Sequence, residues 1–106
     1  MKPKAVIPRK RALRDVDEAI KHYLGEGAPQ AALGFIEALQ RAYAHIARNP
    51  GLGSSTYAVE LNLPGLCFWR LRTYPYLIVY VERADHIDVW CVLHGERDIP
   101  TGMQLE

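Results

Sequence analysis

Apolar and polar residues follow two different periods along this chain of 106 residues. From Arg9 onward, apolar residues recur every three or four positions, the spacing that places them on one face of an α-helix. The first helical run ends at Gly25 and Gly27, because glycine readily adopts the left-handed conformation that closes a helix. Its apolar stripe comprises Leu13, Val16, Ile20, Tyr23 and Leu24.

A second helix is predicted after a short connection. Pro29 suits its first turn, where a missing N–H does no harm, and the segment Asn49-Pro50-Gly51 stops it. Because few residues join the two helices, we expect them to pack as an antiparallel hairpin. The second apolar stripe comprises Ala32, Phe35, Ile36, Leu39, Ala42, Tyr43 and Ile46.

The second half of the chain carries β-branched and aromatic runs separated by short polar turns. Three such runs, 66–72, 76–81 and 87–93, are spaced as consecutive strands of an antiparallel meander. A short apolar run at 5–8 ends in Pro8 and suits an edge strand, because proline has no N–H to offer a neighbour. The pattern therefore predicts an α+β fold: a short N-terminal strand, an antiparallel helix hairpin covering one sheet face, then a three-stranded antiparallel meander (β-α-α-β-β-β).

The length of the chain favours a single domain over residues 1–106, and no linker composition divides it. A possible short strand at 57–61 lies in the loop region between the helices and the meander. Residues 101–106 are expected to fray, as chain ends commonly do.

Alternation along the last strand separates its two faces. The predicted core side carries Ile87, Val89, Cys91 and Leu93, and the other side carries Asp88, Trp90, Val92 and His94. Together with Arg70 and Arg72 of the first meander strand, Trp90 and His94 would make the second sheet face a basic and aromatic binding surface. The alternative is that Trp90 and Phe68 belong to a second small core cluster.

Bulk charge and cysteine content exclude several classes of protein. The formal net charge is +1, so direct nucleic-acid binding is not expected, although basic residues crowd the stretch from Lys2 to Arg14 as a solvated arm or helix face. Cys67 and Cys91 lie in apolar strand patterns, which favours buried thiols over a disulfide or a metal site. The histidines show no ligand spacing with cysteine or acid, so no metal and no cofactor are expected.

No apolar stretch approaches the roughly 20 residues that span a bilayer, and no signal-peptide pattern is visible, so we expect the protein to be located in the cytoplasm.

Candidate chemistry gathers where the last strand runs into a polar tail. His94 could act as a general acid or base, since its unperturbed pKa is near neutrality. Arg97, with Arg70 and Arg72 nearby, could hold a phosphate, and such a set could serve RNA cleavage by attack of a 2′-hydroxyl. The alternative is structural: Arg97 pairs with Asp98 or a nearby glutamate and closes the end of the sheet. Residue types alone favour the structural interpretation.

Several segments nevertheless resemble the ParE branch of the RelE/ParE toxin superfamily. The resemblance spans nearly the whole chain, and the tail VLHGERD after an apolar strand pair is its most specific part. The matching segments are 12–23 (ALRDVDEAIKHY), 31–39 (AALGFIEAL), 49–53 (NPGLG), 71–72 (LR), 76–80 (YLIVY) and 92–98 (VLHGERD).

The resemblance implies the toxin half of a bacterial type II toxin–antitoxin pair. Such toxins are held inactive by a small antitoxin, often a ribbon-helix-helix DNA-binding protein. ParE-like members are reported to poison DNA gyrase, whereas RelE-like members cut mRNA in the ribosome. RelE-like nucleases commonly carry an arginine where this sequence has Leu77, and they use a tyrosine near the C-terminus, whereas no tyrosine follows Tyr80 here. The resemblance therefore favours a gyrase inhibitor that is not an enzyme.

Under this reading the polar rim binds the target and aromatic residues bind the antitoxin. The target-binding candidates are Arg70, Arg72, Trp90, His94, Arg97 and Asp98. The antitoxin-binding candidates are Tyr23, Tyr43 and Trp69. One alternative is a ribosome-dependent nuclease with His94 as acid or base and Arg70, Arg72 and Arg97 on phosphate. The other is a catalytically silent module that binds an antitoxin.

Overall fold

A computed structural model describes residues 2–55, 58 and 63–95. The predicted α+β order is confirmed, with a short 3-10 turn added after the second helix. The elements are β1 (Ala5–Pro8), α1 (Lys10–Gly25), α2 (Pro29–Arg48), η1 (Pro50–Leu52), β2 (Leu66–Arg70), β3 (Tyr76–Glu82) and β4 (His86–His94). The possible strand at 57–61 falls largely outside the described residues, and its one described member, Ala58, has helical backbone. The tail at 101–106 also lies outside them.

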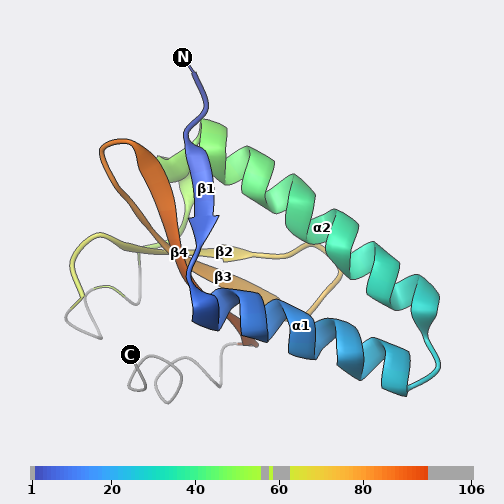
Figure 1. Ribbon diagram of the computed structural model, residues 1–106. Helices are drawn as coiled ribbons and strands as arrows, with labels where there is room; N and C mark the ends of the chain where they lie inside the picture. The colour runs from blue at the N-terminus through green and yellow to red at the C-terminus, as the bar shows by residue number, and fades with distance from the viewer. Residues whose placement is uncertain (1, 56–57, 59–62, 96–106) are drawn as a thin grey trace.

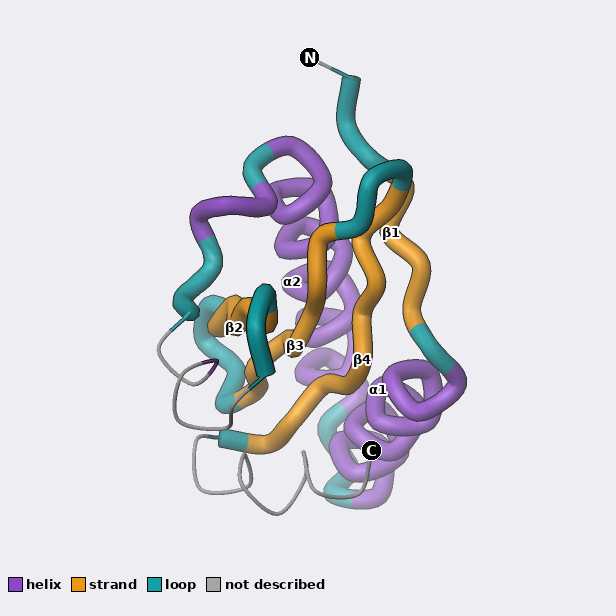
Figure 2. The backbone as a smooth tube through the Cα atoms, turned by 90° about the vertical axis from the view of Figure 1, so that its left-hand side faces the viewer, coloured by secondary structure: helices purple, strands orange, loops and turns teal. Residues whose placement is uncertain are grey.

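The four strands form one mixed sheet in the order β1-β4-β3-β2. The antiparallel pairs β2–β3 and β3–β4 confirm the meander. As predicted, β1 is an edge strand, but it pairs in parallel with β4, the last strand in the chain. Figure 2 shows β1 beside β4, with the start of α1 directly below it. The first and last described elements of the chain are therefore neighbours.

The two helices form a hairpin on one face of the sheet (Figure 1). The predicted stripe of α2 is buried there, with Phe35 and Ile46 fully inaccessible. In α1 the buried residues are instead Ala12 and Ala19, whereas Leu13 is more than half exposed. Small alanine side chains let the α1 backbone approach the sheet closely, while Val16, Ile20 and Tyr23 are partly buried against the same cluster.

A β-bulge in β4 reverses the predicted faces of its second half. Val79 pairs with Cys91 and Tyr80 pairs with Val89, so Trp90 is an extra residue with no partner in β3. One extra residue moves every later side chain to the opposite face. Ile87 and Val89 therefore face the helices as predicted, but the prediction was wrong for the residues after the bulge. Val92 packs in the helix-side cluster, and Cys91 and Leu93 pack on the other face.

The face away from the helices holds a second apolar cluster. This arrangement confirms the alternative in which Phe68 and Trp90 belong to a second small core. Cys67 packs against the helix-side cluster while Cys91 is fully buried in the second one, so the two thiols lie on opposite faces. The buried members of the second cluster are Ala58, Leu66, Phe68, Leu77, Val79, Val81, Cys91 and Leu93.

Where β1 ends, α1 covers the edge of β4. The backbone N–H of Val92 donates to the Asp15 carboxylate at 3.0 Å, which satisfies a strand group that β1 does not reach. Burial raises the pKa of Asp15 above its ordinary value, although the Val92 bond and the charge of Arg11 oppose that shift. Helix and strand are thus joined by one partly buried hydrogen bond.

Candidate functional site

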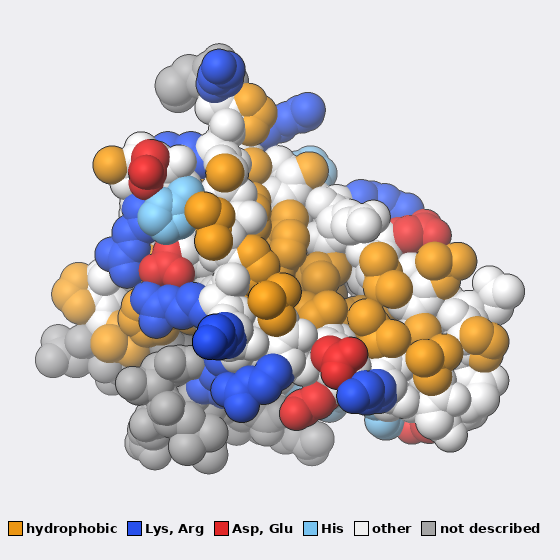
Figure 3. Space-filling model, in the orientation of Figure 1, with side chains coloured by type: hydrophobic (Ala, Val, Ile, Leu, Met, Phe, Trp, Pro, Cys, Tyr) orange, Lys and Arg blue, Asp and Glu red, His pale blue; other side chains and the backbone are white. Residues whose placement is uncertain are grey.

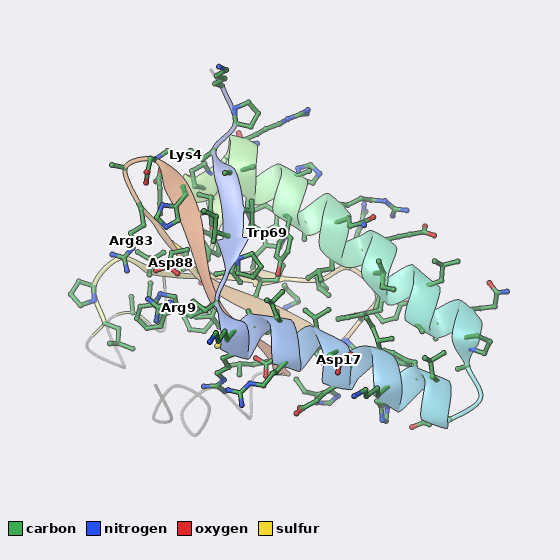
Figure 4. The ribbon with its side chains drawn as sticks, in the orientation of Figure 1. Lys4, Arg9, Asp17, Trp69, Arg83 and Asp88 are labelled. Carbon is green, nitrogen blue, oxygen red and sulfur yellow. The ribbon has the colours of Figure 1, made fainter. Side chains whose placement is uncertain are left out.

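Asp88 is the centre of a polar cluster on the face away from the helices. Its carboxylate accepts two hydrogen bonds from the Arg9 guanidinium, at 3.0 and 2.9 Å. Arg83 donates two more to one carboxylate oxygen, at 3.3 and 3.0 Å, and the Trp90 indole N–H donates another at 3.2 Å. The Arg9 guanidinium also lies over the Trp90 ring, 4.6 Å from its centroid. Figure 4 shows Arg9, Asp88 and Arg83 together beside the start of α1.

The electrostatics of this cluster favour an ionised Asp88, of which 8% is exposed. Burial alone would raise the pKa of this carboxyl, but the hydrogen bonds from Arg9, Arg83 and Trp90 and the charge of Arg9 together hold it below its ordinary value. Lys4 adds a parallel link, donating to Glu82 and to the Arg83 carbonyl at 2.7 Å each. Part of the basic N-terminal run is therefore used to hold β1 against the β3–β4 hairpin.

A pocket of about 570 Å³ lies between α2 and the connection from β2 to β3. Of the predicted site residues it brings together Arg70, Arg72 and Trp69. Arg41 and Glu37 line it from α2, and Arg41 donates to Glu37 at 3.4 Å. Three arginines against one glutamate give the pocket an excess of positive charge.

An aromatic pair forms part of the pocket lining. The Trp69 ring stacks on the His45 ring, with centroids 6.2 Å apart and planes inclined by 17°. Figure 4 shows Trp69 on the α2 side of the sheet. The β2 strand positions Trp69 and α2 positions His45, so the stack links the two walls of the pocket.

Tyr74 closes one end of the pocket against α2. Its hydroxyl donates to the Ala31 carbonyl at 3.0 Å and lies where a side chain on Gly34 would collide with it. Glycine inside a helix costs about 1 kcal/mol relative to alanine, and here the close approach of the tyrosine explains why glycine occupies the position.

Thr73 has a φ of 64°, a left-handed conformation that is rare for a β-branched residue, and its hydroxyl donates to the Arg72 carbonyl at 2.6 Å. This turn aims Arg72 and Tyr74 at the pocket.

The predicted binding surface of Arg70, Arg72, Trp90 and His94 does not exist as one surface. Because of the bulge, His94 lies opposite Tyr76 on the helix side, with the two rings in edge-to-face contact at 5.1 Å. Trp90 packs against the second cluster on the other face. The two arginines are at the pocket instead.

Two of the predicted site residues, Arg97 and Asp98, lie outside the described residues. Their predicted roles in target binding, or in phosphate binding for Arg97, stay predictions, as does the acid or base role of His94.

The predicted antitoxin anchors are partly buried. Tyr23 makes an edge-to-face contact with Tyr74 at 5.7 Å. Tyr43 packs against the helix-side cluster, where burial raises its pKa to about 12. Trp69 also packs against this cluster while lining the pocket. Their role in antitoxin binding stays a prediction.

Several residues of these clusters were not predicted from sequence. Arg41, His45 and Arg48 recur at helical spacing on one flank of α2, and that periodicity is a signal that could have identified them. The Asp88 cluster offers no such signal, because Arg9 and Asp88 are 79 positions apart.

The outer side of the helix hairpin carries an exposed apolar seam. Leu13 and Leu24 of α1 are 56% and 53% exposed, and Leu33 of α2 is 53% exposed. Ile20 and Ile36 are partly buried against the core beside them. Figure 3 shows hydrophobic side chains gathered along the seam of the two helices, with Lys and Arg gathered beside the start of α1.

Within the described ranges 2–55, 58 and 63–95, no three His, Cys, Asp or Glu side chains converge as a metal site requires. In those same ranges, no helix combines the length and the apolar character needed to cross a bilayer.

Comparison with known proteins identifies the family. Among solved structures, the fold is similar to one described as the chromosomal ParDE TA system from P. aeruginosa, with a TM-score of 0.72 and 18% sequence identity over 88% of this chain and 97% of that chain. No curated protein matches the sequence. Residues 6–99 match the family described as the ParE toxin of the type II toxin–antitoxin system, parDE. This chain therefore belongs to the ParE toxin family.

Proposed function

We propose that this chain is a toxin that inhibits DNA gyrase and that a cognate antitoxin, of the ribbon-helix-helix type, neutralises it in the cytoplasm. The observation that carries the choice of target is the environment of Leu77. RelE-like nucleases commonly carry an arginine at the corresponding place in the middle meander strand. Here Leu77 is 4% exposed and packs inside the second apolar cluster, so this face has no cation there to hold an RNA phosphate.

A gyrase assay tests this target. We expect the purified protein to abolish supercoiling of relaxed plasmid by gyrase and to cause cleaved DNA to accumulate. Absence of both effects, with a protein that is folded by circular dichroism, would contradict gyrase inhibition. Cleavage of mRNA in a translation extract, lost in His94→Ala, would favour a ribosome-dependent nuclease instead.

The exposed apolar seam supports the antitoxin part of the proposal. Exposed leucine side chains on both helices form an apolar strip, which suits the apolar face of an amphipathic helix. Membership of the ParE family makes an antitoxin the partner to test first on this surface. Folding of the antitoxin segment onto the seam would bury the side chains that are now exposed.

Substitutions on the seam should weaken antitoxin binding without unfolding the toxin. We expect the double variant Leu13→Ala/Leu33→Ala to raise the Kd for the antitoxin encoded beside this chain by about 30-fold, since a loss of about 1 kcal/mol at each of two apolar anchors sums to about 2 kcal/mol. Titration calorimetry measures the change. Leu52→Ala is the matched control, because Leu52 is 72% exposed and lies in η1 away from the seam. Equal effects of the two changes would place the antitoxin elsewhere.

A further inference from the structure

We propose that the pocket between α2 and the β2–β3 connection binds a nucleotide, with Arg72 and Arg41 on phosphate and the Trp69–His45 pair against the base. This inference does not rest on the choice of gyrase as target. Positive charge is concentrated around this pocket, although the net charge of the whole chain is only +1.

The size and enclosure of the pocket suit a small ligand. Its volume of about 570 Å³ falls within the roughly 300–1,000 Å³ that is usual for small-molecule sites. The walls come from two rigid elements, α2 and β2, and Tyr74 fixes the connection against Ala31 and Gly34. The cavity is therefore held open by packing that the ligand need not supply.

The charge of the lining suits phosphate. Three arginines, Arg41, Arg70 and Arg72, are among the lining residues, and guanidinium forks match phosphate oxygens in geometry. The left-handed Thr73 lies directly after Arg72, and the hydrogen bond from its hydroxyl to the Arg72 carbonyl braces this part of the turn. An arginine on a braced turn loses less conformational freedom when it binds.

The aromatic pair distinguishes a nucleotide from a simple anion. A flat indole stacked on an imidazole offers a polarisable surface of the kind on which bases stack. Glu37, paired with Arg41, adds a carboxylate that can accept a hydrogen bond from a sugar hydroxyl or a base amino group. The flat ring surface, which a run of acidic side chains would not use, favours a nucleotide over an acidic peptide.

A free nucleotide and the end of a nucleic-acid strand share this chemistry. A second, smaller pocket of about 130 Å³ continues along α2, shares Arg41 and His45 with the first, and is also lined by Arg48. A strand could extend a further phosphate toward Arg48, whereas a mononucleotide would not reach it. The contribution of Arg48 therefore separates the two sources.

Calorimetric titration of the full chain tests the proposal with two probes, deoxyadenosine monophosphate and a single-stranded oligodeoxynucleotide of about 8 residues. We expect Arg72→Ala to weaken both by about ten-fold or more, because it removes a charge-assisted hydrogen bond. Trp69→Phe should weaken both by a smaller factor, since a smaller ring stacks less well. Arg14→Ala, an equal charge change on the exposed side of α1, should leave both affinities within about two-fold.

Arg48→Ala and the comparison of the two probes show whether the natural ligand is a free nucleotide or a strand. If Arg48→Ala weakens the oligonucleotide alone, the natural ligand is a strand; if the oligonucleotide binds no better than the monophosphate, it is a free nucleotide. Three results would overturn the proposal. The first is no saturable binding of either probe by folded protein, and the second is an equal loss of affinity in Arg14→Ala and Arg72→Ala. The third is a glutamate-rich peptide that binds more tightly than either probe and whose affinity Trp69→Phe does not change. Melting curves of each variant confirm that it is folded.

Discussion

Replacing Phe35 by alanine is expected to lower the free energy of unfolding by about 3–5 kcal/mol, close to the whole stability of a marginal domain. Phe35 is fully buried where α2 meets the sheet. Its ring contacts three tyrosines, Tyr23, Tyr74 and Tyr76, with centroids 6.2, 5.9 and 5.1 Å away. The three tyrosines come from α1, the β2–β3 connection and β3, so no single movement can refill the cavity.

Urea denaturation followed by circular dichroism measures this change through the midpoint of unfolding. Leu33→Ala is the matched control on the same helix, because Leu33 is 53% exposed and should change the midpoint little. A Phe35→Ala loss below about 1.5 kcal/mol would mean that the tyrosines collapse into the space and that the cluster is less rigid than its contacts indicate.

Asp88→Asn is expected to destabilise the fold by about 2–4 kcal/mol and to lower Tm by roughly 10–20 °C. The substitution keeps the shape of the side chain but removes the negative charge that both Arg9 and Arg83 face. Two guanidinium groups would then lie close together without a counter-charge. Because both are 41–45% exposed on the solvent side, water screens part of the penalty, and the expected loss stays below that of a fully buried pair.

The pH dependence of stability should reveal the same cluster. The pKa of Asp88 is lower in the folded chain than in the unfolded chain, where it is about 3.9. Its stabilising contribution is therefore fully present above that value and is lost as pH falls through the lower folded pKa. Asp15 acts in the opposite sense, since its folded pKa is raised, so stability falls as pH rises through the window between its two values. The difference between wild type and Asp88→Asn isolates the first contribution.

Thermal melts between pH 2 and pH 7 test this expectation, the range being chosen to bracket ordinary carboxyl pKa values. Asp17→Asn is the matched control, because Asp17 forms an exposed pair with Lys21 on the outside of α1 (Figure 4) and should leave Tm unchanged. Parallel Tm curves for wild type and Asp88→Asn across the acid range would contradict a depressed pKa at Asp88.

Local periodicity predicted most of the architecture because it reports what each element buries. The apolar stripe of α2 and the alternation of β2 correspond to buried faces in the structure. Periodicity failed where a tertiary contact overrode it. The bulge at Trp90 adds one residue without any local marker, and it moved Val92 and His94 to the other face.

The candidate sites were less predictable than the fold because they join distant segments. Arg70, Arg72 and Trp69 were identified from their types and strand positions, but the wall opposite them comes from α2. The arginine partners of Asp88 lie directly after β1 and in the β3–β4 turn, and nothing in the residues around Asp88 indicates them. Contacts of this kind depend on the parallel pairing of β1 with β4, which no short-range pattern specifies.

That pairing also sets an order of events during synthesis. The first strand leaves the ribosome long before its neighbour in the sheet exists, since β1 ends at Pro8 and β4 begins at His86. Until then the helix hairpin can form from local contacts, whereas β1 has no strand to join. Arg9 likewise cannot form its ion pair with Asp88 until Asp88 has been synthesised. The nascent chain should therefore complete its sheet only after β4 has been made, and until then the helix hairpin lacks the sheet against which it packs.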